Sequence, residues 1–171
     1  MAKRKRPQRP ARKRDNRLFE LEVFLISGPV TEKFAKDNPV VSRTIAIRGG
    51  QTLSQLHDAI FDAFDRDDEH MYEFQVGGKK PMDPKARRYV LPMVADDAFD
   101  RPAGVVTGAT VGSLGLKQGD AFAYWFDFGD DWWHQLNVKA IVEKAPPGSY
   151  PVVTERVGDS PPQYIDWDEE P

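Results

Sequence analysis

The sequence predicts an α+β domain, in which a mostly antiparallel sheet carries one main helix on one face. Short segments that alternate apolar and polar residues recur along the chain, as half-buried strands do. Residues 52–64 instead place apolar residues at helical spacing. The resulting order is two strands, a helix, a strand, an irregular stretch and two further strands, which favours this fold class.

Two strands are predicted before the helix. Residues 18–27 alternate, and their apolar face is formed by Phe19, Leu21, Val23 and Leu25. Residues 40–48 place Val41, Ile45 and Ile47 on one face. Gly28-Pro29 and Asn38-Pro39 bound the stretch between these strands, which is therefore predicted to be a loop.

The helix begins with a capping box, because Thr52 and Gln55 can each bind the other's backbone N–H group. Its apolar stripe consists of Leu53, Leu56, Ile60, Phe61 and Phe64. Asp58, Asp62 and Asp65 face away from that stripe. Residues 71–76 then alternate as a third strand before Gly77-Gly78.

Four prolines interrupt residues 79–107, where only residues 87–94 suggest a short strand. A short helical turn is predicted within residues 110–120. Two strong strand patterns follow, at residues 121–128 and 133–143.

The stretch DFGDDWWH joins the last two predicted strands. A three-residue loop at Gly129, Asp130 and Asp131 would pair Phe128 with Trp132, and a one-residue shift would mix the two faces. The same register pairs Phe126 with His134, Tyr124 with Leu136 and Phe122 with Val138. It places His134 on the apolar face and Asp127 on the opposite face with Trp125 and Trp133. Asp-Phe-Gly also occurs in kinases, but the other kinase motifs are missing from this sequence.

The composition excludes several classes of protein. The 171 residues include no cysteine, which excludes disulfides and thiolate metal sites. No apolar run approaches the roughly 18 residues that a membrane span requires, and the basic N-terminus lacks the apolar segment of a secretory signal. A cytoplasmic location without a membrane partner is therefore expected.

Charge is distributed unevenly along the chain. Residues 1–17 contain nine of the 24 basic residues and one of the 27 acidic residues, a net charge of +8 against −11 for the remainder. We expect a disordered arm at 1–17, an α+β domain at 18–145 and a proline-rich acidic extension at 146–171. The arm is predicted to bind nucleic acid with little sequence preference; as an alternative it raises solubility or binds polyanions unselectively. Its basic residues are Lys3, Arg4, Lys5, Arg6, Arg9, Arg12, Lys13, Arg14 and Arg17.

Residues 52–74, 111–136 and 156–164 together resemble the plasmid pRiA4b ORF-3-like family. The shared features are a Leu-His pair in the helix, an acidic strand entry that contains a histidine, and the Asp-Phe-Gly-Asp-Asp hairpin. The sequence departs from the family pattern at Trp125 and in the segment VGDSPPQY, where the family carries cysteine. The resemblance implies an α+β fold and an association with mobile elements, and it assigns no activity.

All three histidines lie in these shared motifs. His57, His70 and His134, with Asp67, Asp68 and Asp127, form a candidate site for a divalent metal or another ligand, because imidazole and carboxylate groups suit transition metals. The competing interpretation makes the histidines core residues that carboxylates or backbone groups satisfy. Since no catalytic set is recognisable, we expect a non-enzymatic binding or accessory protein that the arm tethers to nucleic acid. The alternatives are a metal-dependent hydrolase or nuclease that uses the histidines, and a protein-interaction module with an acidic face.

Overall fold

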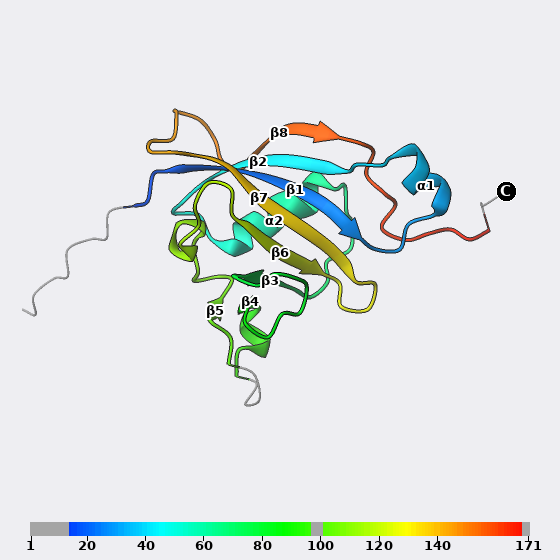
Figure 1. The fold of residues 1–171 in the computed structure, drawn as a ribbon, viewed down its shortest axis with the longest axis horizontal. Coiled ribbons are helices and arrows are strands. Elements are labelled where there is room, and N and C mark those ends of the chain that lie inside the picture. Colours follow the sequence, from blue (N-terminus) through cyan, green and yellow to red (C-terminus); the bar gives the residue numbers. More distant parts are fainter. Residues whose placement is uncertain (1–13, 97–100, 169–171) are drawn as a thin grey trace, which may run out of the picture.

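The fold is α+β, as predicted. A computed structural model describes residues 14–96 and 101–168. It contains one eight-stranded sheet in the order β5-β4-β3-β6-β7-β1-β2-β8 (Figure 1). Neighbouring strands are antiparallel, except that β4 and β5 run parallel. The strands span Leu18–Ser27 (β1), Ser42–Arg48 (β2), Tyr72–Val76 (β3), Arg87–Val90 (β4), Gly104–Val105 (β5), Ala121–Phe126 (β6), Trp132–Val142 (β7) and Val152–Val157 (β8).

The main helix, α2 (Leu53–Ala63), lies across one face of the sheet (Figure 1). Its predicted capping box is present: the Thr52 hydroxyl accepts the Gln55 N–H, and the Gln55 side chain accepts the Thr52 N–H. The buried side chains of the helix are Leu53, Leu56, His57, Ile60 and Ala63. The helix thereby closes the core formed by the inward residues of β1, β2, β3, β6 and β7.

The hairpin of β6 and β7 differs from the predicted register. Its loop covers residues 127–131, and Phe126 pairs with Trp132 while Tyr124 pairs with His134. This is a two-residue shift, which keeps the paired residues of β6 and β7 on their predicted faces, so His134 is buried as expected. The predicted place of Asp127 is wrong. Asp127 adopts φ +58°, a left-handed conformation that aspartate tolerates, and it is buried beside His70 rather than on the Trp125 face.

Short elements were missed where proline and glycine dominate the pattern. The loop predicted at 28–39 contains helix α1 (Glu32–Asp37), whose N-cap Thr31 accepts the Phe34 N–H. The predicted turn within 110–120 is the 3-10 helix η2 (Val111–Leu114), and a second one, η1 (Pro92–Val94), follows β4. The short parallel strand β5 was also not predicted.

Residues on both sides of the range 18–145 contact the folded body. Asp15 and Asn16 accept backbone hydrogen bonds from Gly50 and Ala145, so residues that were assigned to the arm pack onto the domain. At the other end, β8 pairs with β2, so the segment after residue 145 contributes an edge strand. The rest of the predicted arm, residues 1–13, lies outside the described residues.

Arg43 fixes this last strand to the helix. Its buried guanidinium donates through Nε to the Ala63 carbonyl at the end of α2, 2.8 Å away. It also donates to the Val157 carbonyl at 2.9 Å and to the Ser160 hydroxyl at 3.0 Å. A cation at a helix C-terminus also interacts favourably with the negative end of the helix dipole. The C-terminal segment is therefore held over the end of α2.

Candidate metal site

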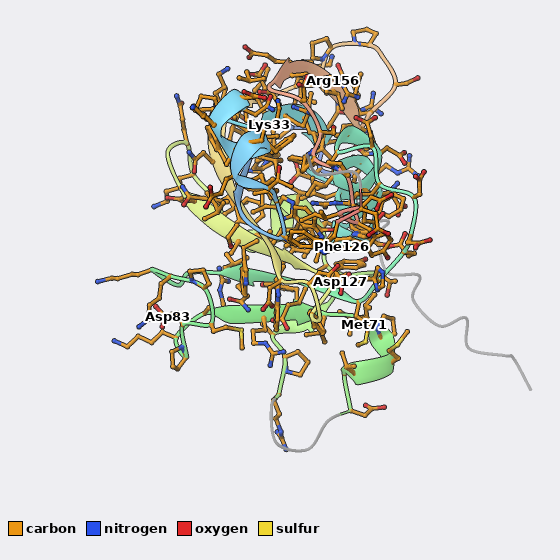
Figure 2. The ribbon with its side chains drawn as sticks, turned by 90° about the vertical axis from the view of Figure 1, so that its right-hand side faces the viewer. Lys33, Met71, Asp83, Phe126, Asp127 and Arg156 are labelled. Carbon is orange, nitrogen blue, oxygen red and sulfur yellow. The ribbon has the colours of Figure 1, made fainter. Side chains whose placement is uncertain are left out.

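A hollow of about 530 Å³ lies between α2, the connection that leads from α2 into β3, and the residues that follow β4. Figure 2 labels Met71, one of its residues, on the same side of the molecule as Asp127. The Met71 carbonyl accepts the Asp127 N–H at 2.8 Å, which joins the hollow to the β6–β7 loop. The lining residues are Ser54, His57, Asp58, Glu69, His70, Met71, Tyr72, Leu91 and Met93.

His57 forms the inner wall of this hollow. It is buried on the second turn of α2, and its ring stacks on Tyr72 with centroids 3.7 Å apart and planes at 1°. Its Nδ1 lies 2.6 Å from the Tyr124 hydroxyl, and its Nε2 contacts a carboxylate oxygen of Glu69. Stacking and two polar contacts therefore fix the orientation of the imidazole, as metal ligands and their supporting groups require.

Burial shifts the pKa values of His57, Glu69 and Tyr124 and so determines their charge. Burial and the positive charge of Arg66 lower the pKa of His57 to about 3. Burial and the neighbouring Asp58 raise the pKa of Glu69. Burial also raises the pKa of Tyr124 well above its usual value, so this phenol stays protonated. A neutral imidazole, which is the form that binds metals, therefore stands beside two carboxyl groups at neutral pH.

His57, Asp58 and Glu69 together can hold a metal ion. One ligand atom from each lies within 4.8 Å of the other two. Zinc binds nitrogen and oxygen at about 2.0–2.2 Å. The three ligand atoms must therefore approach one another more closely than 4.8 Å to share an ion. The Glu69 side chain is 60% exposed and the Asp58 side chain is also exposed, so both carboxylates can rotate toward the fixed imidazole. Three protein ligands would leave a further position open to the hollow.

His70 lines the same hollow but has other partners. Its Nε2 lies 2.7 Å from the Tyr164 hydroxyl and 3.5 Å from Asp127 Oδ2. Its ring meets the edge of Phe126, and its side chain is 37% exposed. The Asp127 carboxylate also accepts the N–H groups of Gly129 and Asp130, so it organises the hairpin loop. The structure thus brings His57 and His70 to one hollow, with separate polar partners.

His134 lies in the core beyond Tyr124. Its Nε2 accepts a hydrogen bond from Arg66 Nη2 at 2.7 Å, and its Nδ1 donates to the Tyr124 carbonyl at 3.2 Å. Burial lowers its pKa well below the usual value, so the ring is neutral. Both nitrogens are occupied by protein groups, which is the arrangement of a satisfied core histidine.

The predicted cluster of three histidines and three aspartates is therefore divided. The backbone N–H groups of Asp67 and Asp68 bind Gln163, and their side chains are exposed. Across residues 14–96 and 101–168, the metal-type group of three is His57, Asp58 and Glu69. Asp58 and Glu69 were not among the predicted ligands. Asp58 directly follows His57, but only the fold shows that Glu69 returns to it.

The predicted nucleic-acid residues are mostly outside the described part of the chain. Lys3 to Lys13 fall within residues 1–13, and Arg14 is exposed. Arg17 instead forms a salt bridge with Asp15 at 2.7 Å and donates to the Gly112 carbonyl at 3.3 Å. Arg17 belongs to the folded body and not to the arm.

The fold and the site define a class: an α+β domain in which a buried histidine of the main helix faces carboxylates in an open hollow. The chain belongs to the plasmid pRiA4b ORF-3-like protein family, whose pattern matches residues 31–166. The fold is similar to the crystal structure of a protein of unknown function, MM3350 from Methanosarcina mazei Go1. The TM-score is 0.63 at 20% identity, over 86% of this chain and 72% of that one.

No curated protein matches the sequence. Among the described residues, none of the helices has the length and apolar character needed to span a membrane.

Proposed function

We propose that the protein is a non-enzymatic binding protein that holds a divalent transition-metal ion at His57, Asp58 and Glu69. The approach of Asp58 and Glu69 to a buried, neutral imidazole supports this proposal. Nitrogen and carboxylate ligands of this kind suit zinc and manganese. The hollow beside them leaves access for an ion from solvent.

The Tyr124 hydroxyl allows the site to accept an ion without losing a buried hydrogen bond. With no ion bound, the His57 Nε2–H donates to Glu69, and Nδ1 accepts from the hydroxyl. With an ion at Nε2, the ring proton would be on Nδ1 and the hydroxyl would accept its hydrogen bond, because a phenol can donate or accept. Either imidazole tautomer is therefore satisfied.

Titration of metal-free protein with ZnCl2, followed by calorimetry, tests the site. We expect one zinc ion per chain, with affinity at least about tenfold weaker in Asp58→Asn and Glu69→Gln, since each substitution removes a charged ligand. Both side chains are exposed, so folding should be unaffected. Asp62→Asn is the matched control, because Asp62 is an exposed acid on the same helix.

Zinc binding that is equal in all four proteins, or that does not saturate at one ion, would contradict the proposal. The predicted alternative is a metal-dependent hydrolase or nuclease. It would require the same ion and, in addition, catalytic turnover of a substrate. Hydrolysis of a single-stranded oligonucleotide by the zinc-loaded protein, lost in Glu69→Gln, would favour that alternative over a binding role.

The second candidate function is attachment to nucleic acid by the N-terminal arm. Residues 1–14 carry eight basic residues and no acid, and the Asp15 carbonyl that follows them accepts the Gly50 N–H. A chain of cations beside an acidic body is suited to bind phosphates and to release their counterions.

Replacing the eight arm cations by glutamine in the full chain tests this attachment. We expect weaker binding of a labelled single-stranded 20-mer. The slope of log affinity against log salt should also become shallower by up to about 6, at about 0.7 for each phosphate contact. Fluorescence anisotropy between low and physiological salt measures both. An unchanged affinity and slope would rule out the arm as the attachment.

A further inference from the structure

The sheet presents a polar and aromatic surface on the side away from α2. Tyr124 and Phe126 face the helix through His57, so their neighbours Ala123 and Trp125 face the opposite way. The register places Trp133 directly opposite Trp125, and Gln135 opposite Ala123. The two indoles stack with centroids 4.9 Å apart and planes at 7°. Phe128 also contacts Trp125, with centroids 4.2 Å apart and planes at 36°.

A strongly basic loop borders this surface. Residues 77–88, here called the lysine hairpin, contain five basic residues and one acid, within a body of net charge −11. Lys79, Lys80, Lys85 and Arg87 are exposed. The fifth basic residue, Arg88, binds the buried carboxylate of Glu73. Four exposed cations are therefore concentrated at one end of an otherwise acidic domain.

The lysine hairpin has a fixed shape. The Asp83 carboxylate accepts the backbone N–H groups of Lys79 and Lys85, both at 2.9 Å. Gln75, which is buried on the side of β3 away from α2, accepts the Met82 N–H at 2.9 Å. Asp83, the single acid of the hairpin, thus binds backbone N–H groups of the turn, and the loop is folded back toward the sheet.

A hollow of about 130 Å³ lies where the lysine hairpin meets β6 and β7. Lys79, Lys80 and Pro81 form one side, and Ala123, Trp133 and Gln135 form part of the other. Trp133, which is 9% exposed, lines the hollow while Trp125 does not, so a flat ring that enters can contact the Trp133 indole there. Alanine at position 123 leaves room for such a ring.

We propose that this hollow and the lysine hairpin bind single-stranded nucleic acid. The exposed lysines would contact phosphates, and one base would stack on Trp133, which is how sequence-tolerant single-strand binders combine charge with aromatic rings. The net positive charge of the hairpin supplies the complementarity to a phosphate backbone. This surface rests on the nucleic-acid binding proposed above, but it uses none of the residues of the arm.

The test uses full-length chains and labelled single-stranded 20-mers of deoxythymidine. We expect Lys79→Glu/Lys80→Glu to weaken binding at least about tenfold at low salt, because two attractive charges become repulsive. Lys33→Glu/Lys36→Glu is the matched control on α1, and Figure 2 places Lys33 far from Asp83 of the hairpin. Ala123→Asp should also weaken binding, and quenching of tryptophan fluorescence by the oligonucleotide should diminish in that variant.

Each outcome separates this surface from the arm. The arm variant and the hairpin variant should each lose affinity, and their combination should lose more than either. Loss in the arm variant alone would overturn the hairpin proposal and leave the arm. Loss of affinity in the hairpin variant alone would support the hairpin proposal and overturn the attachment by the arm. Equal affinity for polyglutamate of matched charge, without tryptophan quenching, would also overturn it, because a base would then have no role.

Discussion

Lowering the pH by two units from 6.5 is expected to reduce the free energy of unfolding by about 2 kcal/mol through His57, and by a further amount through His134. Both rings are buried and neutral, and the pKa of each is depressed in the folded protein, to about 3 for His57. The unfolded chain binds protons near pH 6.5, while the folded protein resists them. The stability from these two groups is therefore fully present above pH 6.5 and is lost as the pH falls below it, for His57 at about 1.4 kcal/mol per unit down to a pH of about 3.

Urea unfolding at several pH values measures this loss. The slope of stability against pH gives the number of protons taken up on unfolding, and we expect nearly two from the histidines. Asp58 and Glu69, whose pKa values are raised, offset a small part of it because they take up protons earlier in the folded protein. His57→Gln should remove one of the two protons from the slope.

Nuclear magnetic resonance supplies an independent check on the same two groups. The imidazole signals of His57 and His134 should stay unchanged through pH 6.5 and below. Titration of both rings near that value would contradict the prediction, and it would also remove the neutral imidazole on which the metal proposal relies.

Arg88→Met is expected to destabilise the protein by about 3 kcal/mol, the low end for breaking a buried ion pair, because Arg88 is partly exposed. Arg88 donates through Nε and Nη2 to the two oxygens of Glu73 at 2.6 and 2.8 Å. Glu73 is buried in the centre of β3, and its other polar partner is the Gln75 amide. Without the guanidinium, a carboxylate remains in a site from which water is excluded.

The double variant Glu73→Gln/Arg88→Met distinguishes a stranded charge from lost packing. Once the carboxylate is neutral, the cost of removing Arg88 should fall to about 1 kcal/mol, since a glutamine can still accept the Gln75 amide. Lys85→Met, which removes an exposed cation of the same hairpin, should be nearly neutral. Thermal and urea unfolding measure the wild type, Glu73→Gln, Arg88→Met, the double variant and Lys85→Met. A double variant as unstable as Arg88→Met would show that packing, and not charge, explains the loss.

Local patterns predicted most of the fold. The apolar alternation of β1, β2 and β3 and the capping box of α2 appear in the structure where the sequence places them. Alternation also fixed the inward face of β7, because a register shift of two residues does not change which face a side chain occupies. The loop length of the hairpin was missed, since it depends on the left-handed conformations of Asp127 and Asp131.

The candidate site was predictable only in part. Helical spacing alone places His57 against the sheet, and its identity makes it a candidate ligand. Its two neighbours in the site follow different rules. Asp58 is adjacent in the chain, whereas Glu69 is twelve residues away and approaches only because the chain reverses between α2 and β3. Nothing in the spacing of acids distinguishes Glu69 from Asp67 or Asp68.

Local sequence patterns predict the α+β class, the faces of the main strands, the main helix and the opposite net charges of residues 1–17 and of the remainder. These properties depend on residues that are close in the chain, where a period or a charge count can be read directly. Tertiary structure alone decided that β8 completes the sheet, that His134 is satisfied by Arg66 within the core, and that the lysine hairpin lies beside Trp133. Each of these contacts joins residues distant in sequence, and their distance is fixed only when the strands pair.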